Sequence, residues 1–181
     1  LLLGGVGLAG GFFYSAAPVG YKYLGLGDVC VFILMGPLMV IGSFFVLTGI
    51  WQSHALWISL PVGCLVAAIL SANNLRDIKH DTEAGIRTTA IVLGHHWARL
   101  EYSALVMGTY LVTLGLMVAG ILPWWSLATW LTLPLALENV SAARHNCVET
   151  PEQIGTLDLR TAKLHLLFGV LLIGSILIEI F

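Results

Sequence analysis

Six stretches of mainly apolar residues, each close to the length of a membrane-spanning helix, dominate the sequence. They run near residues 1–17, 28–50, 55–73, 100–121, 123–140 and 162–181. A helix needs about 20 such residues to cross the hydrocarbon core of a bilayer. With 58% hydrophobic and 10% charged residues, the chain also differs from water-soluble domains and from disordered chains. The sequence therefore predicts an integral membrane protein with six transmembrane helices.

The pattern within these stretches indicates helices rather than membrane strands. A membrane β-strand alternates apolar and polar positions, whereas residues 29–35 are apolar at every position. We therefore expect an all-α, polytopic membrane helical bundle. Pro37, Pro61 and Pro134 fall inside the stretches and predict kinks. The glycine-rich first stretch is expected to pack closely against a neighbouring helix.

The basic residues predict the topology of the bundle. All eight lie in alternate connections, on one side of the predicted membrane: Lys22, Arg76, Lys79, Arg87, Arg99, Arg144, Arg160 and Lys163. The opposite connections, near residues 51–54 and 122–123, contain no Lys or Arg. The positive-inside rule places the charged connections in the cytoplasm and both chain ends outside. A net charge of −2 without a basic face argues against a nucleic-acid partner.

The densest cluster of polar residues, 73–83, follows the third apolar stretch directly. If the helix continues through it, Asn73, Asp77 and Asp81 repeat every four residues and share one face. Carboxylate and amide oxygens suit Mg²⁺, which also keeps waters and binds substrate phosphates. The alternative interpretation is a solvated helix end, where acidic residues at this spacing are common. Ionisable groups and Asn74 next to a membrane favour a magnesium–phosphate site.

Cations accompany this acidic face. Arg76 and Lys79 flank it, and Arg87 follows Gly85 two residues later. Guanidinium and ammonium groups bind phosphate oxygens, so these three side chains are candidate ligands of a substrate phosphate.

A second polar segment, residues 14–28, lies on the same predicted side. Its prolines and glycines predict a turn, with Asp28 as the N-cap of the next helix. Turn formation leaves Lys22 unexplained, and this cation either extends to the membrane surface or reaches a diphosphate. Tyr14 and Tyr21 are expected to line the adjoining substrate pocket.

Residues 73–94, N-N-L-R-D-I-K-H-D-T-E-A-G-I-R-T-T-A-I-V-L-G, resemble the second Asp-rich motif of the UbiA superfamily of intramembrane prenyltransferases. The residue pattern is similar to that of the branch that prenylates 1,4-dihydroxy-2-naphthoate in menaquinone synthesis. The segments 18–28 and 161–169 also resemble this branch. Ile86 departs from the motif, because the family usually has Lys there, and Arg87 is then expected to carry more of the cationic role.

The resemblance implies a nine-helix fold of which this chain supplies the last six helices. We expect residues 1–181 to form one integral-membrane domain that lacks the first three helices and the first Asp-rich motif. Residues 73–99 would form its cytoplasmic Asp-rich region. The chain alone is then expected to be inactive.

The resemblance also implies the reaction. Asp77 and Asp81 would be the catalytic residues that hold Mg²⁺, with Asn73 and Asn74 supporting the diphosphate of a polyprenyl donor. The polyprenyl group would pass to 1,4-dihydroxy-2-naphthoate, giving demethylmenaquinone, CO₂ and diphosphate. The membrane would be the bacterial inner membrane.

Two other functions remain open. Another enzyme of the superfamily would use a different aromatic acceptor. A transporter would bind a cation at Asn73, Asp77 and Asp81, although transporters carry their ionisable residues near the bilayer midplane.

Overall fold

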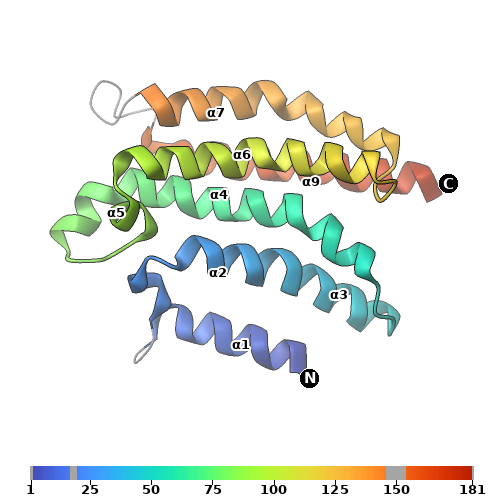
Figure 1. Ribbon diagram of the computed structural model, residues 1–181, viewed down its shortest axis with the longest axis horizontal. Coiled ribbons are helices and arrows are strands. Elements are labelled where there is room, and N and C mark those ends of the chain that lie inside the picture. Colours follow the sequence, from blue (N-terminus) through green and yellow to red (C-terminus); the bar gives the residue numbers. More distant parts are fainter. Residues whose placement is uncertain (1, 17–19, 146–153, 181) are drawn as a thin grey trace.

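The computed structural model of the chain describes residues 2–16, 20–145 and 154–180, and within these ranges every regular element is a helix. Pro18, part of the predicted turn, lies outside them. The helices lie side by side as a bundle (Figure 1), which confirms the all-α fold. The main elements are α1 (Leu2–Ser15), α2 (Gly27–Ile33), α3 (Met39–Thr48), α4 (Ser53–Glu83), α5 (Thr89–Leu93), α6 (His95–Val118), α7 (Leu133–His145) and α9 (Leu157–Ile180).

Four helical segments are long and apolar enough to cross a membrane. They are Gly27–Thr48, α4, α6 and α9. The first predicted stretch forms the shorter α1. The fifth is divided between the 3₁₀ helix η3 (Trp124–Thr132) and α7. All six stretches are therefore helical in the described residues, but the first and fifth do not form single α-helices of spanning length.

The prolines explain where the helices change type. Pro37 lies in a π-helical turn, η2 (Leu34–Leu38), between α2 and α3. Pro134 is the second residue of α7, directly after η3. Proline has no N–H to donate to the preceding turn, so the hydrogen-bond ladder shifts register there. Pro61 is accommodated inside α4 itself.

Helix α4 is the centre of the bundle. Its buried residues Leu65, Leu75 and Ile78 belong to a core that includes Tyr102 of α6 and Phe168 of α9. Burying these side chains among neighbouring helices fixes the position of α4. The polar residues at its C-terminal end are positioned with it.

Two glycines outside the glycine-rich stretch allow a close contact between helices. A Cβ at Gly36 would lie 2.7 Å from the Cα of Gly63, so η2 and α4 approach backbone to backbone. In α1, only Gly10 is in comparably close contact, with Leu34, and Gly5 has no neighbour within 4 Å of such a Cβ. The expected packing of the glycine-rich stretch against a neighbouring helix is therefore close at Gly10, ordinary at Gly7 and absent at Gly4, Gly5 and Gly11.

The connections follow the predicted alternation. The α1–α2 connection and the long α4–α6 connection, which contains α5, lie at one end of the bundle (Figure 1). The α3–α4 and α6–η3 turns lie at the opposite end, together with the N and C ends of the chain. The basic connections thus share one end, as the charge pattern predicts.

Candidate functional site

The polar motif continues the central helix beyond its apolar part. Helix α4 extends through the motif to Glu83, so Asn73, Asp77 and Asp81 lie on one helical face. All three side chains are partly buried. This helical continuation confirms the geometry on which the sequence argument depended.

Arg76 lies over this face and binds most of its oxygen atoms. Its Nε donates to Asp77 Oδ1 at 2.8 Å, and Nη2 donates to Asp77 Oδ2 at 2.8 Å. The same Nη2 donates to Asn73 Oδ1 at 2.5 Å. A bidentate guanidinium–carboxylate pair of this kind fixes both side chains. In the structure, Arg76 therefore binds the predicted metal ligand Asp77 and the predicted diphosphate ligand Asn73.

Asp158 is a site residue that the sequence analysis missed. This carboxylate, in the first turn of α9, accepts a hydrogen bond from Arg76 Nη1 at 2.5 Å. Its other oxygen, Oδ1, is buried without a partner in the described residues. An acidic residue in a first helical turn is usually explained by the helix dipole alone. Arg76 and Asp158 are 82 positions apart, so no local sequence pattern indicated that they pair.

Asn74 lies on a different face from Asn73. Its side chain is buried, and Nδ2 donates to Asp28 Oδ1 at 3.1 Å. The predicted N-cap role of Asp28 is wrong, because α2 starts at Gly27 with Leu26 as its N-cap. Asp28 is instead a buried acceptor that joins α2 to α4 beneath the site.

The remaining cations of the motif are exposed. Gly85, with a φ of 70°, turns the chain after α4, and Ile86 N donates to Asp81 O at 2.9 Å. Lys79 and Arg87 project from this region. Neither has an ion-pair partner among the residues that the structure describes. Both side chains are thus available to an incoming anion.

Lys22 lies among aromatic rings at the same end of the bundle. Its Nζ is 5.9 Å from the ring centre of Tyr14 and 5.8 Å from that of Tyr23. Tyr14 and Tyr21 meet edge to face at 5.6 Å, and the Tyr21 hydroxyl donates to Gly10 O. Burial raises the pKa of Tyr21 further above its usual value, so the hydroxyl is protonated at neutral pH with or without this shift. The rings hold the ammonium group by cation–π attraction without neutralising it.

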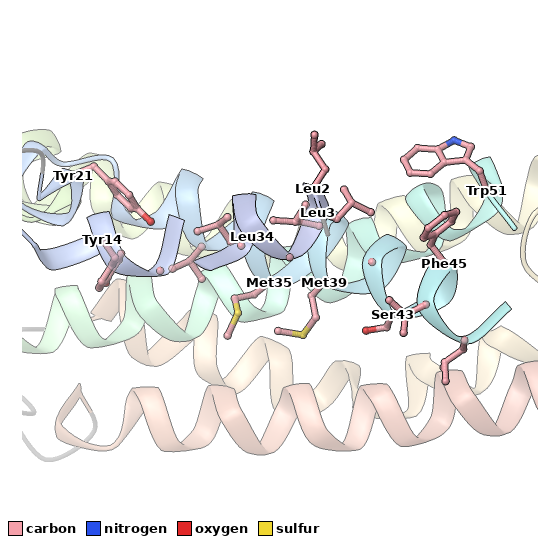
Figure 2. Close-up of a pocket in the computed structure, with 18 residues that line it drawn as sticks. Leu2, Leu3, Tyr14, Tyr21, Leu34, Met35, Met39, Ser43, Phe45 and Trp51 are labelled. Atoms are coloured by element: carbon pink, nitrogen blue, oxygen red, sulfur yellow. The ribbon is translucent and has the colours of Figure 1, made fainter. Parts of the chain in front are cut away.

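An apolar groove of about 1340 Å³ extends from these two tyrosines between α1 and the α2–α3 segment (Figure 2). Tyr14 and Tyr21 both line it, as expected of a pocket at this position, and its use by a substrate stays a prediction. Figure 2 shows Tyr14 and Tyr21 at one end and Trp51 at the other. Aromatic rings that hold the Lys22 ammonium group lie at one end of the groove, and the rest of the groove is a long apolar channel.

The donor set fits Mg²⁺ only together with a substrate. Within residues 2–16, 20–145 and 154–180, three or more His, Cys, Asp or Glu side chains do not gather into a metal-binding group. The side-chain oxygens of Asn73 and Asp77 nevertheless converge on one positive group, the guanidinium of Arg76. Such an oxygen face suits Mg²⁺ when water and phosphate oxygens complete the coordination of the ion. These residues therefore fit the ion as part of a shared site.

Comparison with known proteins gives consistent matches. The model of the UbiA prenyltransferase family matches residues 1–148. The chain is 33% identical over 180 residues to 1,4-dihydroxy-2-naphthoate octaprenyltransferase of Bacillus subtilis, covering 99% of this chain and 57% of that protein. It is also 33% identical over 175 residues to human UbiA prenyltransferase domain-containing protein 1, covering 95% and 48% respectively. The chain thus spans about half the length of these relatives.

Proposed function

The chain belongs to the UbiA prenyltransferase family, and from this membership we propose that its α4 face binds the diphosphate of a polyprenyl donor. The observation that carries the proposal is the oxygen face of Asn73, Asp77 and Asp81, with Arg76 directly over it. The exposed Lys79 and Arg87 add positive charge at the same end. Oxygen ligands and free cations together suit a magnesium diphosphate.

In this proposal, Asp77 and Asp81 would hold Mg²⁺, which would supply Lewis-acid neutralisation of the diphosphate charge. Arg76, steadied by Asp158, donates to diphosphate oxygens, and Lys79 adds a second cation. These charges stabilise the leaving group as the allylic carbon–oxygen bond breaks. The apolar bundle excludes water from the resulting carbocation.

The proposed acceptor is 1,4-dihydroxy-2-naphthoate. The electron-rich ring forms the new bond to the allylic carbon, and its carboxylate leaves as CO₂, giving the demethylmenaquinone skeleton in its reduced, quinol form and free diphosphate. The name of the Bacillus subtilis relative, a 1,4-dihydroxy-2-naphthoate octaprenyltransferase, supports this acceptor. The human relative is named without an acceptor, so a different aromatic acceptor is the second candidate.

We propose further that residues 1–181 act within a longer protein, in a bacterial plasma membrane, with the basic connections in the cytoplasm. The greater length of the relatives supports this view. Residues 73–99 then form a cytoplasmic surface over the site. The position of the ionisable residues at one end of α4 favours chemistry on a substrate headgroup over cation transport.

The test is prenyl transfer in membranes that contain this chain together with the N-terminal part of the Bacillus subtilis relative. Radiolabelled polyprenyl diphosphate and 1,4-dihydroxy-2-naphthoate are supplied with and without Mg²⁺. We expect a Mg²⁺-dependent product that Asp77→Ala and Asp81→Ala each reduce by about 100-fold or more. Glu83→Ala, at the exposed end of the same helix, is the matched control and keeps full activity.

The result also separates the alternatives. Product with another aromatic acceptor alone would replace the naphthoate and retain the diphosphate site. Absence of any product from folded, co-purifying halves would contradict the proposed function.

A further inference from the structure

The guanidinium of Arg76 has few donors left for a substrate. A guanidinium carries five N–H groups and no acceptor. Four of the five bond to side chains that the structure describes: Nε and Nη2 each donate to Asp77, Nη2 also donates to Asn73, and Nη1 donates to Asp158. A diphosphate would find a single N–H, on Nη1, outside these bonds. Arg76 therefore binds a diphosphate firmly only after it releases part of this set.

The same bonds cover the proposed metal ligand Asp77. Both of its carboxylate oxygens accept from Arg76 at 2.8 Å. Each of the two side chains is 31% exposed, so bulk water screens their attraction only in part. A divalent cation at this carboxylate would lie beside a guanidinium of like charge, which opposes its binding. Without substrate, the face is therefore closed to a free metal ion.

Asp158 allows Arg76 to leave Asp77 without losing every counter-charge. Its Oδ2 accepts from Nη1 of Arg76, and only 18% of its side chain is exposed. Its Oδ1 is buried and has no partner among the described residues. An unpaired buried acceptor is costly, so this oxygen indicates a bond that forms in another arrangement. A guanidinium released from Asp77 would complete a two-bond pair with Asp158 and keep three N–H groups for phosphate oxygens.

We propose that the Arg76–Asp77 pair closes the empty site and opens only to a metal ion and a diphosphate together. In the bound state, Asp77 is a ligand of Mg²⁺, Arg76 forms two bonds with Asp158, and its other N–H groups donate to the diphosphate. The proposal rests on the proposed function and adds the order of binding at the same site, because the donor enters as its magnesium complex.

Charge balance explains why neither ligand alone is enough. A metal ion alone would take Asp77 and leave Arg76 facing a second cation. A diphosphate alone would take Arg76 and leave the carboxylate of Asp77 facing an anion. When both bind, each displaced side chain gains a partner of opposite charge, so the binding of one ligand favours that of the other.

The first experiment measures metal binding without diphosphate, on the 181-residue chain purified in detergent. Mn²⁺ replaces Mg²⁺, and electron paramagnetic resonance measures the free ion. A site that is open in about one tenth of the molecules binds about tenfold more weakly than an open one, so Arg76→Gln should bind Mn²⁺ about tenfold more tightly than the unchanged chain. Arg76→Lys keeps the charge without the two-bond geometry and should gain about threefold.

Arg160→Gln is the matched control for the loss of charge. Arg160 is a cation of α9 that pairs with Glu138 at 3.4 Å, so its removal changes the net charge equally without releasing Asp77. The affinity of this variant for Mn²⁺ should stay that of the unchanged chain. Adding Asp77→Ala to Arg76→Gln should remove the gain, because the additional metal binds that carboxylate.

The second experiment is the mirror image and measures binding of radiolabelled pyrophosphate in the presence of EDTA. Asp77→Asn removes the charge that holds the guanidinium, so pyrophosphate should bind about tenfold more tightly than to the unchanged chain. Asp81→Asn removes the same charge one turn further along α4, where the structure shows no hydrogen bond to Arg76. This variant should gain less than about threefold.

The outcomes separate this proposal from the proposed function. An unfolded variant loses binding, so misfolding does not produce a gain in either experiment. Equal Mn²⁺ affinities for the two Arg76 variants and the unchanged chain, or equal pyrophosphate gains for Asp77→Asn and Asp81→Asn, would overturn the proposal. Magnesium pyrophosphate that still binds, and that Asp77→Ala releases, would leave the diphosphate site standing. Its failure to bind both to this chain and to the chain assembled with the N-terminal part of the Bacillus subtilis relative would contradict the proposed function as well.

Discussion

At the scale of single residues, the site depends on which side chains bind the guanidinium of Arg76. Its guanidinium is shared between Asp77 and Asn73 on its own helix and Asp158 on α9. The pair with Asp158 anchors Arg76 from a second helix, so the side chain can leave Asp77 without leaving the site. We infer that Asp158 positions Arg76, so that the guanidinium can release the Asp77 carboxylate, which it binds in this structure, to a metal ion.

Asp158→Asn should therefore lower prenyl transfer about 10-fold without abolishing it, because Arg76 loses its anchoring charge. The effect should appear in the KM for the polyprenyl diphosphate more than in that for the aromatic acceptor. Steady-state kinetics in the assembled membranes measure both constants. An equal loss for both substrates would show that Asp158 has only a structural role.

The buried pair of Asp28 and Asn74 predicts a stability effect. Asn74→Ala removes the amide donor of the buried Asp28 carboxylate and leaves it only the bond from Thr89, which costs about 1–3 kcal/mol. The double variant with Asp28→Ala should recover part of the loss, because the buried carboxylate is then gone. The unfolding temperatures of the single and double variants, purified in detergent, measure both effects. A double variant less stable than Asn74→Ala would contradict this explanation.

At the scale of elements, the position of α4 depends on backbone contact with η2. Gly36 and Gly63 allow this approach, and the π-helical turn at Pro37 lies at the same crossing. The hydrogen bond between Asn74 and Asp28 lies further along the same pair of helices. The crossing therefore sets where the site and the groove lie relative to each other.

Gly36→Ala should destabilise the protein by about 1–3 kcal/mol, because the new Cβ overlaps the Gly63 backbone and forces the helices apart. Gly115→Ala in α6 is the matched control, since its Cβ meets nothing within 4 Å. Alanine there should be neutral or stabilising through helix propensity. Equal unfolding temperatures for the two variants would rule out the close crossing.

At the scale of the whole molecule, one end of the bundle gathers the charged connections and the other gathers the aromatic turns. The motif of α4, the cations and the polar end of the groove all lie at the charged end, and the apolar part of the groove leads away from it. This arrangement gives a headgroup and a tail separate environments. The predicted orientation places the headgroup in the cytoplasm.

Cysteine labelling tests the orientation. In a background without native cysteines, Lys79→Cys should react with a membrane-impermeant maleimide only in inverted vesicles. Gln52→Cys, on the opposite connection, should react only in intact cells or right-side-out vesicles. Both positions are exposed, so access is decided by the membrane. The reverse pattern would contradict the positive-inside prediction.

The sequence by itself determined the helical membrane class, the alternation of connections and the placement of Asn73, Asp77 and Asp81 on one helical face. These properties follow from local patterns: apolar length, basic residues in alternate connections, and a four-residue spacing that an α-helix converts into one face. Six apolar stretches were also recognisable, although the prolines changed the helix type at Pro37 and next to Pro134.

Only the tertiary structure decided which residues meet across the bundle. The contacts of Asp158 with Arg76, of Asp28 with Asn74 and of Gly36 with Gly63 join residues from separate elements. The groove likewise exists only because α1 touches its neighbour closely at Gly10 and leaves room at Gly11. Such contacts depend on how helices pack side by side, and one-dimensional periodicity specifies the face of a helix without specifying its partner.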